Sequence, residues 1–163
     1  EHFCRRLSVI PVEVVVRNRV AGSLAKRYGL EEGVALFFPL VELFYKSDAL
    51  GDPLASDDVA AALGWAQRDE LAAMREDALA VNEALQAHLA ARGVVLVDFK
   101  LEFGRDRLGG LWLCDEITPD GCRLWDAATG ARLDKDVFRR DLGDLAETYR
   151  ALHLRLLGRP LEA

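Results

Sequence analysis

Segments with a two-residue apolar period predict the strands of this chain. Residues 8–18 are rich in β-branched residues and predict a strand, with Pro11 near its start. Residues 34–46 also read as extended, but Pro39 interrupts them. Residues 94–103 and about 110–115 flank the Gly-rich, charged segment 104–110, which predicts an antiparallel hairpin.

Segments with a three- to four-residue apolar step predict the helices. The longest covers 68–92, where Leu71, Met74, Ala78, Val81, Leu85 and Leu89 form one apolar stripe that we interpret as core packing. Shorter helices are expected at 22–29, at 56–64 with Ser56 as cap, and at 145–157. Helices mixed with an antiparallel hairpin indicate the α+β (mixed α/β) class.

The strand over 94–103 is expected to have two unlike faces. Side chains alternate across a strand, so one face should carry apolar residues and the other a charged row. The apolar face holds Val95, Val97, Phe99, Leu101 and Phe103; the charged face holds Asp98, Lys100 and Glu102. With Asp115 from the neighbouring strand, these carboxylates suit Mg²⁺, which prefers oxygen ligands. A solvated face with cross-strand ion pairs is the alternative.

A basic cluster follows the first strand. Arg17, Arg19, Lys26 and Arg27 occur with no acid between them, in a chain of net charge −6. Ala21-Gly22-Ser23 opens a helix there, and free N–H groups at a helix start bind anions. Ser23 and Arg17 could therefore hold one phosphate monoester, although a plain basic surface helix fits the same pattern.

A turn after the hairpin brings a further cation. Pro119-Asp120-Gly121 is a tight-turn sequence, and Arg123 follows it directly. This places a guanidinium near the acidic strand residues. An ordinary turn with Trp125 buried explains the same residues and does not exclude the role of Arg123.

Composition narrows the class of partner. The chain has 163 residues, 51% hydrophobic and 29% charged, which suits about one globular domain. Its negative charge argues against binding along a nucleic-acid backbone. The three cysteines form no CxxC pair, which fits a reducing cytoplasm. No apolar run is long enough to cross a bilayer. The first residue is not Met, and we expect residues upstream.

Four segments together resemble the SAICAR synthetase family of purine biosynthesis. They are "IPVEVVVRNRVAGSLAKRYGLEEG" (10–33), "LVDFKLEFG" (96–104), "DEITPDGCRLWD" (115–126) and "DKDVFRRDLG" (134–143). The resemblance implies a two-lobe nucleotide-binding fold of which this chain is mainly the larger C-terminal lobe. Residues 1–16 would be the remnant of the N-terminal lobe and its hinge strand, and residues 17–163 the catalytic and substrate-binding domain. The glycine- and lysine-containing segment that covers the ATP phosphates in the family is not found here.

The resemblance also implies a reaction and its partners. An ATP-dependent ligase would join L-aspartate to carboxyaminoimidazole ribonucleotide through an acyl phosphate, with Mg²⁺ neutralising the phosphates. A homo-oligomer, commonly a dimer, is implied. A small-molecule kinase with a similar Asp-x-Lys strand, or a non-catalytic fragment, are the alternatives. A requirement for aspartate in product formation distinguishes the ligase from the kinase, which would make ADP without aspartate. Calorimetry that detects no binding of Mg·ADP, with or without the ribonucleotide, would favour the non-catalytic fragment.

Site residues are assigned by resemblance, position by position. Asp98 and Lys100 would line the reacting centre, and Glu102 and Asp115 would hold Mg²⁺, with Glu116 and Asp120 behind them. The substrate would contact Arg17, Ser23, Arg123, Lys46 and Asp48. Adenine would lie over the backbone of Val9, Ile10, Pro11 and Glu13.

Overall fold

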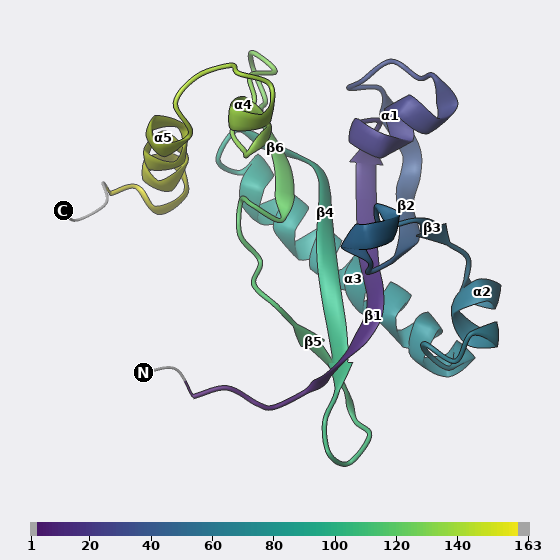
Figure 1. Cartoon of the computed structure of the whole chain (residues 1–163). Helices are drawn as coiled ribbons and strands as arrows, with labels where there is room; N and C mark the ends of the chain where they lie inside the picture. The colour runs from purple at the N-terminus through teal and green to yellow at the C-terminus, as the bar shows by residue number, and fades with distance from the viewer. Residues whose placement is uncertain (1–2, 160–163) are drawn as a thin grey trace.

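The computed structural model describes residues 3–159, which form one antiparallel sheet with helices around it (Figure 1). The strands are β1 (Ser8–Arg19), β2 (Ala35–Tyr45), β3 (Leu54–Ala55), β4 (Val94–Arg105), β5 (Leu111–Cys114) and β6 (Cys122–Asp126). The helices are α1 (Gly22–Tyr28), the 3₁₀ turn η1 (Asp48–Leu50), α2 (Asp57–Ala62), α3 (Arg68–Ala90), α4 (Asp136–Arg139) and α5 (Leu145–Leu157). The mixed α/β class is confirmed.

The sheet has the order β3-β2-β1-β4-β5, and β4 has a forked edge. β6 pairs with the first half of β4, as far as Phe99, and β5 pairs with the second half from Glu102. At the fork, the backbone N–H of Lys100 donates instead to the carbonyl of Gly121, at 3.0 Å. The loop that joins β5 to β6 therefore passes directly beside Lys100.

One face of the sheet is covered by α3, which packs against β4 and β1. The apolar stripe of α3 is buried there as expected, with Leu71, Met74 and Ala78 at 0–1% exposure. They pack in one cluster with Val14 of β1 and Phe99 of β4, among others. Burial of this apolar surface is the main stabilising contribution to the fold.

Most predicted elements are present within a residue or two. The hairpin, the long helix and the last helix are confirmed, and Ser56 caps α2 by accepting from the Val59 N–H at 3.2 Å. β2 runs through Pro39, but its pairing with β1 is irregular opposite that region, between Arg17 and Arg19. Two short elements of the C-terminal part, β6 and α4, were not predicted.

The predicted alternation along β4 is wrong at its first two apolar positions. The pairing of β4 with β6 is irregular between Leu96 and Asp98, and this irregularity exchanges the two faces. Before it, Val94 and Leu96 join the core under α3. Val97 instead packs on the opposite face with Ala21 and Trp125, and Val95 packs against the same cluster. Phe99, Leu101 and Phe103 face the core as predicted.

The expected domain boundary after residue 16 falls inside β1, which continues to Arg19 without a break. The division of the chain into residues 1–16 and 17–163 therefore stays a prediction. Residues 1–2 and 160–163 of the expected units lie outside the described residues. Between residues 3 and 159, none of the helices combines the length and the apolar character that a bilayer crossing requires.

Candidate functional site

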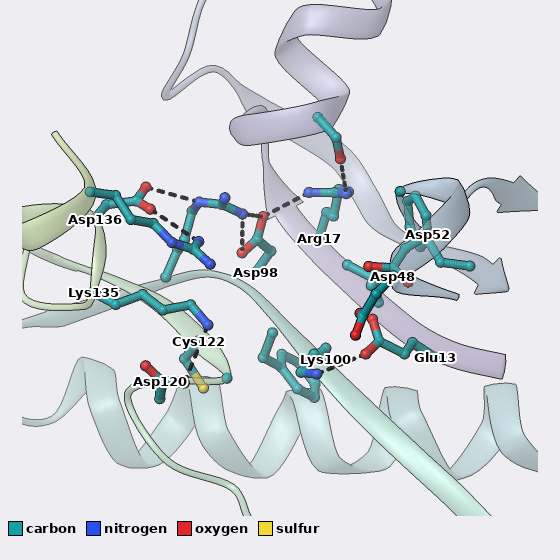
Figure 2. A pocket seen from close by; sticks show the side chains of 18 residues that line it. Glu13, Arg17, Asp48, Asp52, Asp98, Lys100, Asp120, Cys122, Lys135 and Asp136 are labelled. Atoms are coloured by element: carbon teal, nitrogen blue, oxygen red, sulfur yellow. Dashed lines mark hydrogen bonds and ion pairs between the residues drawn. The ribbon is translucent and has the colours of Figure 1, made fainter. Parts of the chain in front are cut away.

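A polar cavity of about 420 Å³ opens on the face of the sheet opposite α3 (Figure 2). It is bounded by β1 and β4, the start of α1, the η1 loop, the β5–β6 loop and α4. Its charged lining is Glu13, Arg17, Asp48, Asp52, Asp98, Lys100, Asp120, Arg123, Lys135, Asp136 and Arg139. Segments as distant as residues 13 and 139 thus meet in one polar site.

Arg17 lies on the floor of the cavity and is only 3% exposed. Its Nε donates to Glu42 at 2.6 Å, Nη1 to Asp98 at 2.8 Å and Nη2 to the Ser23 hydroxyl at 2.8 Å. Arg27 also donates to Glu42. Arg17 and Ser23 are together, as the phosphate prediction requires, and the guanidinium is held in one orientation by three side chains.

Asp98 lies between two arginines. Its carboxylate accepts from Arg17 and, at 3.1 and 2.9 Å, from Nη1 of Arg123. The side chain points into this cavity because Asp98 follows the irregularity in β4. Burial raises the pKa of Asp98, while Arg123 and Arg17 act to lower it. Asp98 thus fixes the relative positions of the two guanidinium groups.

Arg123 reaches the cavity from β6 and is anchored by α4. Its Nε donates to Asp136 at 3.1 Å, and Asp136 also lies 3.7 Å from Arg139. The guanidinium packs against the backbone of Gly22, where a Cβ atom would lie 2.6 Å from Nη2. Only glycine fits there, since Gly22 also has a φ of +54°.

Lys100 stands at the fork of β4, with its ammonium directed toward Glu13. The Nζ–Oε1 distance to Glu13 is 2.8 Å, and Glu102 lies 3.7 Å away. Burial alone would lower the pKa of Lys100, but Glu13, Glu102 and Asp115 raise it. Lys100 is therefore a charged ammonium at the edge of the cavity.

The predicted metal ligands lie next to the cavity rather than in its lining. Glu102 is 6% exposed and pairs with Lys46 at 2.5 Å, while Asp115 is exposed with a φ of +68°. Cys114, which precedes Asp115, pairs directly with Glu102 across β4 and β5. No group of three His, Cys, Asp or Glu among residues 3–159 is arranged to hold a metal. Two carboxylates suit an Mg²⁺ that takes its other ligands from phosphate and water.

The remaining predicted residues are divided between the cavity and its surroundings. Asp48 and Asp120 line it; Glu116 is exposed on the β5–β6 loop, and Lys46 is paired with Glu102. In the predicted hinge only Glu13 lines the cavity.

The other hinge residues belong to β1 outside the cavity. Val9 is 51% exposed, Ile10 is fully buried in the core, and the Pro11 carbonyl accepts from the Lys46 N–H. The pairing of β1 with β4 is irregular between Val9 and Glu13. The predicted hinge, residues 9–13, thus coincides with the part of β1 that is not regularly paired with β4.

Sequence reasoning missed several residues that hold the site together: Glu42, Lys135, Asp136 and Arg139. Glu42 is a single acid in an otherwise apolar strand, which is a detectable signal of a buried ion pair. Asp136 and its neighbours belong to "DKDVFRRD", whose dense charge fits a solvated helix equally well. Their roles follow from the tertiary position of α4.

Comparison with known proteins gives consistent matches. The sequence profile of a family described as SAICAR synthetase matches residues 1–155. Phosphoribosylaminoimidazole-succinocarboxamide synthase of Anoxybacillus flavithermus is 56% identical over 158 residues, 97% of this chain and 66% of that protein. The chain thus spans about two thirds of the length of such curated relatives.

Solved structures agree with the sequence matches. A crystal structure of SAICAR synthetase from Pyrococcus horikoshii has a TM-score of 0.92 and 52% identity, covering 97% of this chain and 69% of its own. A SAICAR synthetase in complex with ADP has a TM-score of 0.93, also at 52% identity, covering 97% and 67%. The fold of these SAICAR synthetases is therefore matched over almost all of the present chain.

Proposed function

The chain belongs to the SAICAR synthetase family, and we propose that it provides the catalytic and substrate-binding part of a purine-biosynthesis ligase. The reaction joins L-aspartate to carboxyaminoimidazole ribonucleotide with ATP, through an acyl phosphate, and releases ADP and phosphate. A carboxylate is a poor electrophile, and its phosphorylation supplies the leaving group that the aspartate amine then displaces. The ADP complex of a family member supports nucleotide binding.

One observation carries the proposal: the cavity unites anion-binding groups with the charged face of β4. Arg17, Ser23 and Arg123 meet at one end, and Lys100 stands at the other. We assign the 5′-phosphate of the ribonucleotide to the arginine end, where Asp98 aligns both guanidinium groups. The ring carboxylate then extends toward Lys100, whose ammonium stabilises negative charge on the transferring phosphoryl group.

Mg²⁺ belongs with the nucleotide phosphates beside Lys100. Glu102 and Asp115 would hold it, and the ion supplies charge neutralisation of those phosphates. Lys46 pairs with Glu102 at 2.5 Å, and this hydrogen bond raises the pKa of Lys46. Glu116 and Asp120 lie on the β5–β6 loop that follows Asp115, and Asp48 faces the cavity from η1.

The adenine site and the assembly extend the proposal. The backbone of Val9, Ile10, Pro11 and Glu13 would contact adenine at the irregular end of β1. Residues 1–16 would then be the remnant of the N-terminal nucleotide lobe with its hinge strand, and residues 17–163 the catalytic and substrate-binding domain. We further propose a homodimer in the cytoplasm, where the three free cysteines stay reduced.

The test is an assay of the purified protein with ATP, Mg²⁺ and carboxyaminoimidazole ribonucleotide, with and without L-aspartate. Release of ADP that requires aspartate, together with the succinocarboxamide product, supports the ligase. ADP release without aspartate indicates a kinase instead. If calorimetry with Mg·ADP and with the ribonucleotide detects no binding, the chain is a non-catalytic fragment. Lys100→Ala should lose turnover, whereas Lys26→Ala, an exposed lysine of α1 outside the cavity, should keep it.

A further inference from the structure

Glu32, in the loop after α1, joins two walls of the cavity without lining it. Its carboxylate accepts from both Nη atoms of Arg140, at 2.9 and 2.8 Å, and from Arg132 at 3.1 Å. It also accepts from the backbone N–H of Gly22 at 3.1 Å. Arg140 directly follows α4, and Gly22 begins α1, so one carboxylate connects helices more than a hundred residues apart (Figure 1).

These contacts form a closed ring of interactions around the arginine end of the cavity. Glu32 holds Gly22, Gly22 packs against the guanidinium of Arg123, and Arg123 is bonded to Asp136 of α4. Arg140 completes the ring, because it donates to Glu32 and lies 3.8 Å from Asp136. The position of the Gly22 peptide thus limits where the Arg123 guanidinium can lie.

The strength of the contact agrees with this geometry. The hydrogen bonds from Arg140 outweigh the effect of burial and lower the pKa of Glu32 to about 2. The carboxylate is therefore ionised over the whole physiological range. Its tie between α1 and α4 is permanent rather than a pH switch.

We propose that Glu32 is a positioning residue for the phosphate-monoester end of the cavity. It acts through Gly22 on Arg123, and through the start of α1 on Ser23. This inference rests on the proposed function, which assigns the phosphate to that end. The expectation is that Glu32 influences affinity for a sugar phosphate although it does not touch the ligand.

The test measures binding of ribose 5-phosphate to the purified protein by calorimetry. Glu32→Gln keeps the shape of the side chain but removes the charge, and should weaken binding about tenfold, as expected for the loss of a charged hydrogen bond. Glu31→Gln removes the neighbouring exposed charge and should change nothing. Glu70→Gln is matched in kind, because Glu70 also accepts from an arginine and from a backbone N–H, and neither Glu70 nor this arginine lines the cavity. It should lower stability but leave affinity unchanged.

A second readout does not need the ligand. The Nε–Hε resonance of Arg123 in a proton–nitrogen spectrum should shift in Glu32→Gln and stay in place in Glu70→Gln. Wild-type affinity and an unmoved Arg123 resonance in Glu32→Gln would overturn the positioning role, while loss of binding in Arg123→Ala would leave the proposed function standing. If the wild type does not bind ribose 5-phosphate, or Arg123→Ala binds it equally well, the phosphate assignment itself fails, and the positioning role fails with it.

Discussion

Arg17→Met is the most informative substitution, because Arg17 joins two buried carboxylates. The guanidinium is 3% exposed, and its partners Glu42 and Asp98 are 8% and 3% exposed. Breaking a buried ion pair by removing one partner costs about 3–5 kcal/mol, because the remaining charge stays buried. Each carboxylate keeps a second arginine, so we expect the lower limit, about 3 kcal/mol.

The measurement is chemical and thermal unfolding against a matched surface pair. A loss of about 3 kcal/mol in a domain of this size lowers Tm by about 6–12 °C. Arg68 pairs with Asp58 at 2.8 Å, the same distance as Arg17 to Asp98, but these side chains are 73% and 80% exposed. Arg68→Met should therefore cost only about 0–1 kcal/mol.

Neutralising the partners provides a further check. If uncompensated buried charge causes the loss, Glu42→Gln added to Arg17→Met should recover part of the stability. Equal losses in Arg17→Met and Arg68→Met would refute the reasoning, as would a second substitution that only adds to the damage. Any effect of Arg17→Met on the apparent KM for the ribonucleotide has to be measured on the folded fraction of the protein.

Three further predictions test separate parts of the site. Gly22→Ala should lower both Tm and affinity for ribose 5-phosphate, because its Cβ would displace the neighbouring guanidinium; Gly29→Ala, with a similar positive φ but open space around it, should lower Tm alone. Glu102→Gln and Asp115→Asn should each abolish turnover by weakening Mg²⁺ binding, and near-normal rates in both would exclude them as ligands. The pKa of Glu32 is lowered from 4.5 to about 2 in the folded protein, so the ionised carboxylate stabilises the fold above pH 4.5 and this contribution is lost as the pH falls toward 2. Glu32→Gln should therefore destabilise the protein at neutral pH and differ little from wild type near pH 2. A constant difference across that range in acid-unfolding curves would contradict this assignment.

The order of the helices and main strands was readable from local patterns. The apolar step that predicts α3 reflects a helix with one side buried on a sheet, and Ser56 carries its capping group in its own side chain. α3 ends at Ala90, and Gly93 closes the turn that follows it, where a φ of +68° suits glycine. Such features depend on residues within a few positions of each other, which is why the sequence alone determined them.

The arrangement of the site depended on tertiary structure. A period-two pattern cannot reveal the irregularity that turns Val97 away from the core and directs Asp98 between two arginines, because it lies in the pairing of β4 with a strand distant in sequence, β6. Nor can it show that Glu32 and Arg140 meet, since their contact spans 108 positions of the chain. The sequence by itself determined which charges this protein carries and on which elements; the packing of α1 and α4 at one end of the sheet decided which of them are neighbours, because ion pairs form wherever the folded backbone brings opposite charges within reach.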